Sequence, residues 1–306
     1  MRLSVIVCTH NLVQTIQPCL DSITASLAHA SPVQAEIIIV TNSMDEAIFK
    51  LVHSWAANCG FPTRILRESR RGLAAARNCA LREAKGELLA FIDNDCRLDK
   101  EYVAHALRQD ASDNSLVLRG GRIELGDSSD HPIAIKSDRS LRRWSRKIRS
   151  ARYENLGSCI LGGNMMMRRA VIDKLGLFDE RFGPGAPIPL GLDTDYVFRA
   201  YLADIKIEYM PDLAVFRYHG QKSDQDNTSF CRNQMVAAGA LYAKFFFRDP
   251  DILRPLYWSI KGSFYKIFGD KKSEPHGADL FYEMMPFYQA VGAVRFFFLK
   301  PNDYRS

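Results

Sequence analysis

The chain has 306 residues, of which 47% are hydrophobic and 25% charged, and this composition excludes general disorder and predicts one large folded unit with room for an appendage. The net charge of +6 is too mild to indicate a nucleic-acid partner, and we expect none, although it suits phosphates or an acidic membrane surface. Seven cysteines without a CxxC spacing exclude a disulfide framework and a zinc cluster, which favours a reducing cytoplasm.

The first hundred residues alternate short apolar runs with helical patterns. The predicted strands are Leu3–Cys8, Glu36–Thr41, Thr63–Arg67 and Glu87–Asp93, and the predicted helices pass through Leu20 and Ile23, Asp45–Ala57 and Leu73–Ala84. This alternation is typical of βαβ units and predicts an α/β fold with a parallel sheet covered by helices on both faces. In such sheets ligands bind beyond the carboxyl ends of the strands, so polar residues there are the first candidates for a site.

The next segments continue the sheet and then change character. Glu101–Leu125 reads as a helix followed by a strand, and Gly126–Pro132 reads as a polar loop. Lys136–Arg152 holds eight basic residues against one acid, with Leu141, Trp144 and Ile148 at helical spacing. We therefore predict a basic amphipathic helix there.

The last quarter of the chain, from Phe230 onward, contains more than half of the aromatic residues and predicts a helical appendage. Two glycine-rich stretches can act as linkers, Gly183–Gly191 and Gly269–Gly277, and the first of them is better explained as a mobile active-site loop. No run of 18 apolar residues occurs, so we expect no membrane-spanning helix.

Two carboxylates, Asp93 and Asp95, directly follow the buried strand that ends at Asp93. This DxD pattern offers hard oxygen ligands to Mg²⁺ or Mn²⁺, with the remaining ligands supplied by phosphate and water, as expected for an ion that carries a diphosphate. The alternative is that the two acids only end the strand and cap the next helix.

The segment Arg70–Asn78 lies one helix upstream of the acids. Gly72 stands at a turn from strand to helix, where a ligand can approach the backbone, and Arg77 can pair with phosphate oxygens in a forked geometry. The alternative for Arg77 is an exposed arginine on a helix.

A second acidic cluster, Asp193 and Asp195, follows the loop that ends at Gly191 and stands before a helix. A carboxylate near a metal-bound diphosphate can take the proton from an attacking hydroxyl, so one of these acids is a candidate catalytic base. The alternative, strongest for Asp195, is plain N-capping of the helix.

Two further candidates lie between and after these clusters. Gly162 and Gly163 allow a ligand to approach the backbone next to Asn164. His219, at the end of an apolar run, is either a metal or phosphate ligand or a structural histidine.

Together these segments resemble the family 2 inverting glycosyltransferases with a GT-A fold, over about residues 2–220. The resemblance rests on Ser4–Asn11, Gly72–Asn78, Asp93–Asp95, Gly162–Asn164, Gly176–Gly183, and Asp193–Tyr196 with Arg199. It implies a mostly parallel, Rossmann-like sheet flanked by helices, with a nucleotide-binding part at 1–98, an acceptor part at 99–225, and the helical appendage at 226–306.

The same resemblance assigns roles to the candidate residues. Asp95 would bind the metal, Asp93 the metal or the nucleotide ribose, and Asp193 would activate the acceptor hydroxyl. His219 would lie near the diphosphate as a further metal ligand. The residues that would border the nucleotide-sugar are Thr9, Asn11, Asn42, Gly72, Arg77, Asp93, Asn94 and Asn164.

The reaction implied is a single displacement that inverts the anomeric carbon, with Mn²⁺ or Mg²⁺ offsetting charge on the departing nucleoside diphosphate. A UDP-sugar is the expected donor, and a sugar, glycolipid or polysaccharide the expected acceptor. Three positions depart from the family pattern: Thr41 and Asn42 replace an acid that reads uracil, Leu192 replaces an acid before the base, and Cys8 and Leu12 replace proline and arginine.

Two other functions fit parts of the sequence. A sugar-phosphate nucleotidyltransferase would need a glycine-rich loop and a lysine after the first strand, where this chain has Thr9, His10 and Asn11. A non-catalytic nucleotide-sugar-binding protein is suggested by Leu192 and Thr41. The basic segment beside Trp144, which includes Arg142, Arg143, Arg146, Lys147 and Arg149, suits an acceptor at the inner face of the membrane.

Overall fold

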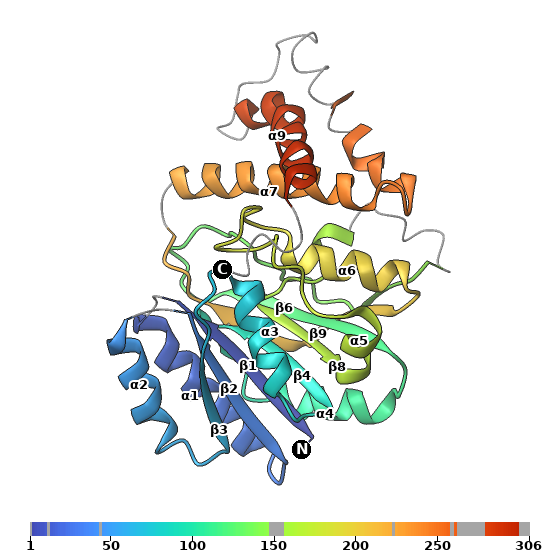
Figure 1. Cartoon of the computed structure of the whole chain (residues 1–306). Helices are drawn as coiled ribbons and strands as arrows, with labels where there is room; N and C mark the ends of the chain where they lie inside the picture. Colours follow the sequence, from blue (N-terminus) through green and yellow to red (C-terminus); the bar gives the residue numbers. More distant parts are fainter. Residues whose placement is uncertain are drawn as a thin grey trace.

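The computed structural model describes residues 2–10, 13–42, 45–146, 156–221, 224–257, 260–261 and 279–299. A central sheet joins nine strands in the order β3-β2-β1-β4-β8-β6-β9-β5, with β7 paired to β9 (Figure 1). The first four strands are β1 (Leu3–Thr9), β2 (Ala35–Thr41), β3 (Thr63–Arg67) and β4 (Leu88–Asp93), all mutually parallel where they pair. The strand pattern expected from the sequence is therefore confirmed to within one residue at each end.

Helices cover both faces of this sheet, as the βαβ alternation predicted. One face packs on α1 (Val13–His29), α2 (Glu46–Ala56) and α4 (Tyr102–Ser112), and the other on α3 (Leu73–Glu83), α5 (Arg169–Leu175) and α6 (Leu192–Leu202). Alternate residues of β1, such as Val5 and Ile6, belong to different core clusters because successive side chains of a strand point to opposite faces.

The second half of the sheet mixes strand directions. It consists of β5 (Cys96–Leu98), β6 (Val117–Leu125), β8 (Asn164–Arg168) and β9 (Lys206–Arg217). β8 runs antiparallel between β4 and β6, whereas β6 and β9 are parallel over nine paired positions. The antiparallel insertion of β8 places Gly163 beside the end of β4, where the Asp93 N–H donates to the Gly163 carbonyl at 3.3 Å.

The basic amphipathic helix predicted over 136–152 is wrong for its described part. Arg142–Trp144 forms the short strand β7, which pairs antiparallel with β9. Trp144 is buried, but Leu141 is 45% exposed, so these two residues do not share one apolar helix face. Arg142 and Arg143 pair with Asp138 and Glu208, while Lys147 and Arg149 lie outside the described residues.

The helical character expected from Phe230 onward is found in α7 (Asp224–Phe245), the 3-10 turn η3 (Pro250–Leu253) and α9 (Asp279–Phe298), which lie above the sheet in Figure 1. A Cβ at Gly239 would lie 1.8 Å from the Gln289 carbonyl oxygen, so glycine permits α7 and α9 to cross at backbone contact. Ala237 and Leu241 of α7 belong to the same core cluster as α6, so α7 shares a core with the preceding part of the chain. The division into domains at residue 225 stays a prediction.

The remaining predictions from the sequence concern two glycine-rich stretches, the cysteines and membrane-spanning helices. The stretch Gly183–Gly191 is closed by a bridge between Phe182 and Ile188, and its mobility stays a prediction. Gly269–Gly277 lies outside the described residues. All seven cysteines are free, as expected. Within the described part of the chain, no helix combines the length and apolarity needed to cross a bilayer.

Buried charge holds the β6–β9 pair together. The Glu208 carboxylate, 0% exposed, accepts from Arg119 Nε at 3.1 Å and from Arg143 Nε at 2.8 Å, and Lys206 Nζ lies 3.0 Å away. We expect Glu208→Ala to lower the free energy of unfolding by about 3 kcal/mol, because it leaves the buried Arg119 guanidinium with only its longer contact to Asp113, at 3.4 Å. Urea unfolding of the variant beside the wild type measures this.

A matched control is Glu124→Ala on β6, whose carboxylate is 22% exposed and pairs with Arg122 and with the exposed Arg139. Because water can replace these partners, its removal should cost only about 1 kcal/mol. Burial works to raise the pKa of Glu208, but Arg143, Lys206 and Arg119 together hold that pKa below its usual range. A folded-state pKa below the unfolded one means that the stabilisation is present above about pH 4 and is lost on further acidification. Equal losses for both variants, or a Glu208→Ala difference that grows in acid, would contradict this account.

Candidate active site

A cavity of about 400 Å³ lies at the end of β4, between α3, the N-terminus of α6 and one side of α7. Its lining includes Arg77, Asp93, Gly163, Asp193 and Arg217, which come from distant parts of the sequence. Asp93 and Asp193 therefore lie on the same side of the sheet and face one space. The hypothesis drawn from the sequence requires these two acids to lie in one site.

A short chain of hydrogen bonds links these two acids through the backbone of one residue, Gly162. Arg77 Nη2 donates to Asp93 Oδ1 at 3.1 Å and to the Gly162 carbonyl at 2.8 Å, and the Gly162 N–H donates to Asp193 Oδ2 at 2.8 Å. The peptides of Gly162 and Gly163 can come this close because both lack a side chain: a Cβ on Gly163 would lie 2.8 Å from Asp93 Oδ2. The two glycines thus set the separation of the acids.

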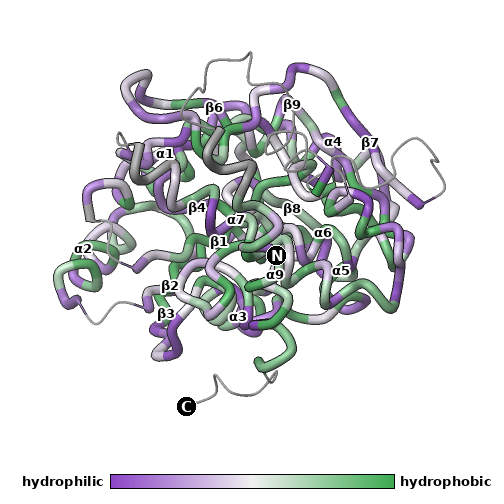
Figure 2. Tube along the Cα trace, turned by 90° about the horizontal axis from the view of Figure 1, so that it is seen from above, coloured by the Kyte–Doolittle hydropathy of each residue, from purple (hydrophilic) through white to green (hydrophobic). Residues whose placement is uncertain are grey.

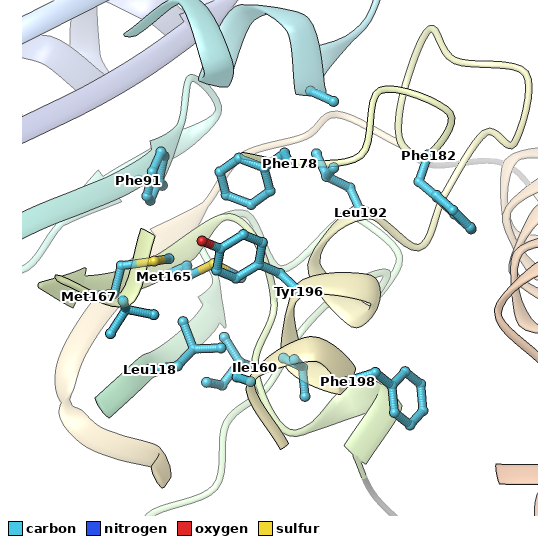
Figure 3. Packing of buried hydrophobic residues seen from close by; sticks show 14 of the residues in the cluster. Phe91, Leu118, Ile160, Met165, Met167, Phe178, Phe182, Leu192, Tyr196 and Phe198 are labelled. Atoms are coloured by element: carbon cyan, nitrogen blue, oxygen red, sulfur yellow. The ribbon is translucent and has the colours of Figure 1, made fainter. Parts of the chain in front are cut away.

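Arg77 is held rigidly, contrary to the exposed-arginine alternative. Its side chain is 3% exposed, and the guanidinium carbon lies 5.5 Å and 5.6 Å from the ring centroids of Phe91 and Phe178. These rings pack edge-on at 5.4 Å within the core shown in Figure 3. Aromatic faces attract a guanidinium, so the two rings help to hold Arg77 at the cavity that it lines.

Arg217 stands between the two carboxylates of the DxD pattern. Its Nε donates to Asp95 Oδ2 at 3.1 Å, and its Nη2 lies 3.6 Å from Asp93 Oδ2. Burial raises the pKa of Asp95 above the usual aspartate value; Arg217 opposes this rise and Asp93 adds to it. Burial works to lower the pKa of Arg217, but Asp95 and Asp93 raise it above its ordinary value. Arg217 was not among the sequence candidates.

Asp193 lies in the first turn of α6, where the backbone holds its carboxylate. Oδ1 accepts from the Thr194 N–H at 2.9 Å, in addition to the Gly162 bond to Oδ2, and the positive end of the helix dipole favours the negative charge. The N-cap is Gly191, at φ +87°, so N-capping by Asp195 is wrong. Asp195 is instead buried and paired with Arg199 at 3.0 Å and Lys244 at 2.6 Å.

Leu192 precedes Asp193 and is 3% exposed. Figure 3 shows it among the core side chains near Phe178 and Phe182. The residue at which the chain departs from the family's acidic pattern therefore packs into the core, and the loop at Gly183 adapts to it, since a Cβ there would lie 3.1 Å from Leu192 Cβ.

The candidates at the ends of β1 and β2 form a second group beside the cavity. Asn94 Nδ2 donates to Thr9 Oγ1 at 2.9 Å, and Asn42 Nδ2 donates to the Gly72 carbonyl at 3.3 Å. Gly72 has φ +112°, which favours glycine, and its turn touches the Gly183–Gly191 loop through the Leu73 N–H bond to Pro184 at 3.0 Å. Asn11 lies outside the described residues.

Asn164 and His219 are placed differently from the other candidates. The Asn164 amide is 1% exposed and bonds to Tyr102 at 2.8 Å and to the carbonyls of Leu213 and Arg122 at 2.8 Å and 3.1 Å, so it joins strands in the interior. We leave it out of the proposed donor site. His219 Nδ1 accepts from the Gln221 N–H at 3.0 Å and lies 3.7 Å from Asp130. In the described ranges, no three His, Cys, Asp or Glu side chains gather around one point, so His219 as a metal ligand stays a prediction.

Comparison with known proteins identifies the family of the chain. A family model described as Glycosyl transferase family 2 matches residues 4–176, more than half of the chain. The chain belongs to this family. The match covers the DxD pattern and the two glycines of the cavity, whereas Asp193 and Arg217 lie beyond it.

Curated relatives of this family 2 member are remote. Glycosyltransferase AglE of Haloferax volcanii is 22% identical over 185 residues, which cover 60% of this chain and 58% of AglE. Putative glycosyltransferase EpsH of Bacillus subtilis is 28% identical over 125 residues, 41% of this chain and 35% of EpsH. This family 2 chain thus spans less than three fifths of the length of either relative.

Solved structures share the GT-A fold with this family 2 chain. Mannosyltransferase PcManGT of Pyrobaculum calidifontis, in complex with GDP-Man and Mn²⁺, superposes with a TM-score of 0.63 at 17% identity, covering 97% of this chain and 87% of its own. S. aureus TarS 1–349 gives a TM-score of 0.58 at 16% identity, covering 97% and 89%. At these identities the likeness confirms the predicted fold class and stops there.

Proposed function

We propose that this protein is an inverting glycosyltransferase that moves a sugar from a nucleoside-diphosphate donor to an acceptor hydroxyl. One observation carries the proposal: Asp93 and Asp193 face the same cavity, and the backbone of Gly162 connects them through its N–H to Asp193 and its carbonyl to Arg77, the partner of Asp93. A donor held by its diphosphate at the Asp93 side would present its anomeric carbon toward Asp193.

In this proposal Asp193 is the catalytic base. Its carboxylate takes the proton of the acceptor hydroxyl as the hydroxyl oxygen forms a bond to the anomeric carbon, and the bond from that carbon to the nucleoside diphosphate breaks with its electron pair. Attack from the face opposite the leaving group inverts the carbon and needs no covalent sugar intermediate. The Thr194 and Gly162 N–H groups keep the carboxylate oriented.

The donor would lie across the carboxyl ends of β1, β2 and β4. Thr9, Asn42 and Asn94 are joined to this edge by hydrogen bonds, and Arg77 is fixed where its guanidinium meets phosphate oxygens. The S. aureus TarS fragment binds UDP-GlcNAc and PcManGT binds GDP-Man. A UDP-sugar is our expected donor, and Thr41 and Asn42, in place of an acid, make a GDP-sugar the first comparison.

The carboxylates of Asp93 and Asp95 fit a divalent ion that arrives with the diphosphate. Mg²⁺ in such sites takes one or two carboxylates and completes its shell with phosphate and water, so two protein ligands suffice. When bound, Mn²⁺ or Mg²⁺ would offset charge on the departing nucleoside diphosphate. Arg217 neutralises part of the carboxylate charge without the donor, so we expect metal alone to bind weakly.

The acceptor would enter along α7, which forms the wall of the cavity facing α6. One side of this helix, with Phe230, Gln234, Ala237, Ala238 and Leu241, lines the space. Most of these side chains are apolar, and they suit the less polar face of a sugar, or the aglycone of a glycolipid, as well as a polysaccharide end.

The experiment is a thermal-shift panel of UDP- and GDP-sugars with and without Mn²⁺. A ligand at a hundred times its Kd adds about 2.7 kcal/mol to the free energy of unfolding. We expect a clear rise in melting temperature for one donor with Mn²⁺, a smaller rise for that donor alone, and almost none for Mn²⁺ alone. If no nucleotide-sugar stabilises the protein under any of these conditions, the donor site is refuted.

A non-catalytic nucleotide-sugar-binding protein is the second candidate, favoured by the apolar Leu192 next to the proposed base. It predicts the same stabilisation by donor, but no nucleoside diphosphate release with a broad panel of acceptors. Release of pyrophosphate instead would indicate a nucleotidyltransferase.

A further inference from the structure

A second cavity, of about 360 Å³, lies where the C-terminal ends of α5, α6 and α7 meet. Four basic residues line it: Arg146, which follows β7, Lys174 of α5, Arg199 of α6, and Arg248, just after α7. None of the described residues that line it is acidic, and none of them lines the cavity of Asp93 and Asp193. We call these four residues the basic pocket.

The charge of the basic pocket is only partly compensated within the protein. Arg199 gives Nε to Asp195 and Nη1 to the carbonyls of Leu175 and Leu177, but its buried Nη2 has no hydrogen-bond partner among the described residues. Arg146 lies 3.9 Å from Asp249, too far for a hydrogen bond.

The other two cations are more open still. Lys174 and Arg248 are exposed, and they form no ion pair within the described part of the chain. Since like charges gathered around one space repel each other, an anion with several oxygen acceptors would stabilise this arrangement.

Two exposed aromatic residues directly precede Arg248 of the basic pocket. They are Phe246 and Phe247, which are 38% and 84% exposed. Hydrophilic stretches lie beside β7, the strand that precedes Arg146, in Figure 2. Phe246 and Phe247 therefore expose apolar rings close in sequence to a basic residue, Arg248. Aromatic rings beside Lys and Arg are typical of contacts with the headgroup region of a membrane.

We propose that the basic pocket binds a phosphate group that belongs to the headgroup of an anionic lipid. Phe246 and Phe247 favour a lipid over free phosphate as the ligand. The phosphate would sit among the four cations, and the phenyl rings would enter the interface next to it. This inference does not depend on the proposed transferase activity, because the two cavities are separate.

The test uses the full chain and vesicles of phosphatidylcholine with or without phosphatidylglycerol, in a sedimentation assay at physiological salt. The pocket variant is Lys174→Ala with Arg248→Ala. The control is Lys50→Ala with Arg108→Ala, which removes the same charge from two exposed residues of α2 and α4 that do not line the pocket. Each basic residue near an anionic surface contributes about fivefold to binding, so the pocket variant should bind anionic vesicles roughly thirtyfold more weakly than wild type.

Two further measurements distinguish a lipid headgroup from free phosphate as the ligand of the basic pocket. Phe247→Ser should weaken vesicle binding but leave binding of inorganic phosphate, measured by calorimetry, unchanged. Saturable phosphate binding that the pocket variant loses, without any vesicle binding, would keep the phosphate site and overturn the lipid headgroup as its ligand. Equal losses in pocket and control variants, or no binding of phosphate or vesicles by the wild type, would overturn the whole proposal.

Discussion

The Asp193→Asn variant should bind donor like the wild type but transfer sugar about 10² to 10⁴ times more slowly. The amide keeps the size of the side chain, but its single oxygen can accept from only one of the Thr194 and Gly162 N–H groups, which bind different oxygens of the carboxylate. The loss of one such bond should cost about 1 kcal/mol, so the local fold should persist. What the amide lacks is the basicity to take a proton from the acceptor. Nucleoside diphosphate release in the presence of acceptor measures the loss, and the donor thermal shift measures retained binding.

Asp204→Asn is the matched control for this substitution. Asp204 follows α6, is exposed, and has φ +56°, a conformation that asparagine adopts readily. This variant should transfer at the wild-type rate. Full activity of Asp193→Asn would remove Asp193 from the chemistry, and a loss of donor binding equal to the loss of turnover would assign it to the donor site instead.

Gly163→Ala should lower kcat/KM by about 10²-fold, because the added methyl group would lie 2.8 Å from Asp93 Oδ2 and would push the carboxylate out of place. The substitution should also cost about 1–3 kcal/mol of folding free energy through overpacking. Steady-state kinetics with saturating acceptor and the donor thermal shift with Mn²⁺ check the first effect, and urea unfolding checks the second.

Gly157→Ala provides the comparison within the same cavity. A Cβ there meets its nearest neighbour, Thr194 Cγ2, only at 3.7 Å, which is ordinary contact. It should therefore cost much less activity and almost no stability. If the two alanine variants behave alike, the close approach of Gly163 to Asp93 has no bearing on the site.

Particular elements show what could be predicted from the sequence. The strands that end at Thr9, Thr41 and Asp93 were predictable because each is a short run buried on both faces and followed by polar residues. The strand that ends at Arg67 is only partly buried at the sheet edge and was predictable from the alternation of strands and helices. The basic segment was mispredicted because helical spacing of Leu141 and Trp144 is a local signal. The unpaired edge of β9, which offers hydrogen bonds to Arg142–Trp144, is absent from local sequence.

Arg217 shows the same limit within the site. It reaches Asp95 because β5 and β9 pair antiparallel with Cys96 opposite Arg217, a register between segments more than a hundred residues apart. In the sequence it is one arginine at the end of an apolar run, with nothing to link it to the DxD pattern. A search for cations at the ends of later strands would have been the only available signal.

By itself, the sequence determined the class of fold, the four parallel strands, and the identity of the acids Asp93, Asp95 and Asp193, because burial periodicity and strand-terminal polar residues are written locally along the chain. Only the tertiary structure decided that Asp93 and Asp193 share a cavity, that Arg217 neutralises the DxD carboxylates, and that four scattered cations surround the basic pocket. The physical reason is that these arrangements depend on strand register and helix packing between distant segments, which local patterns do not encode.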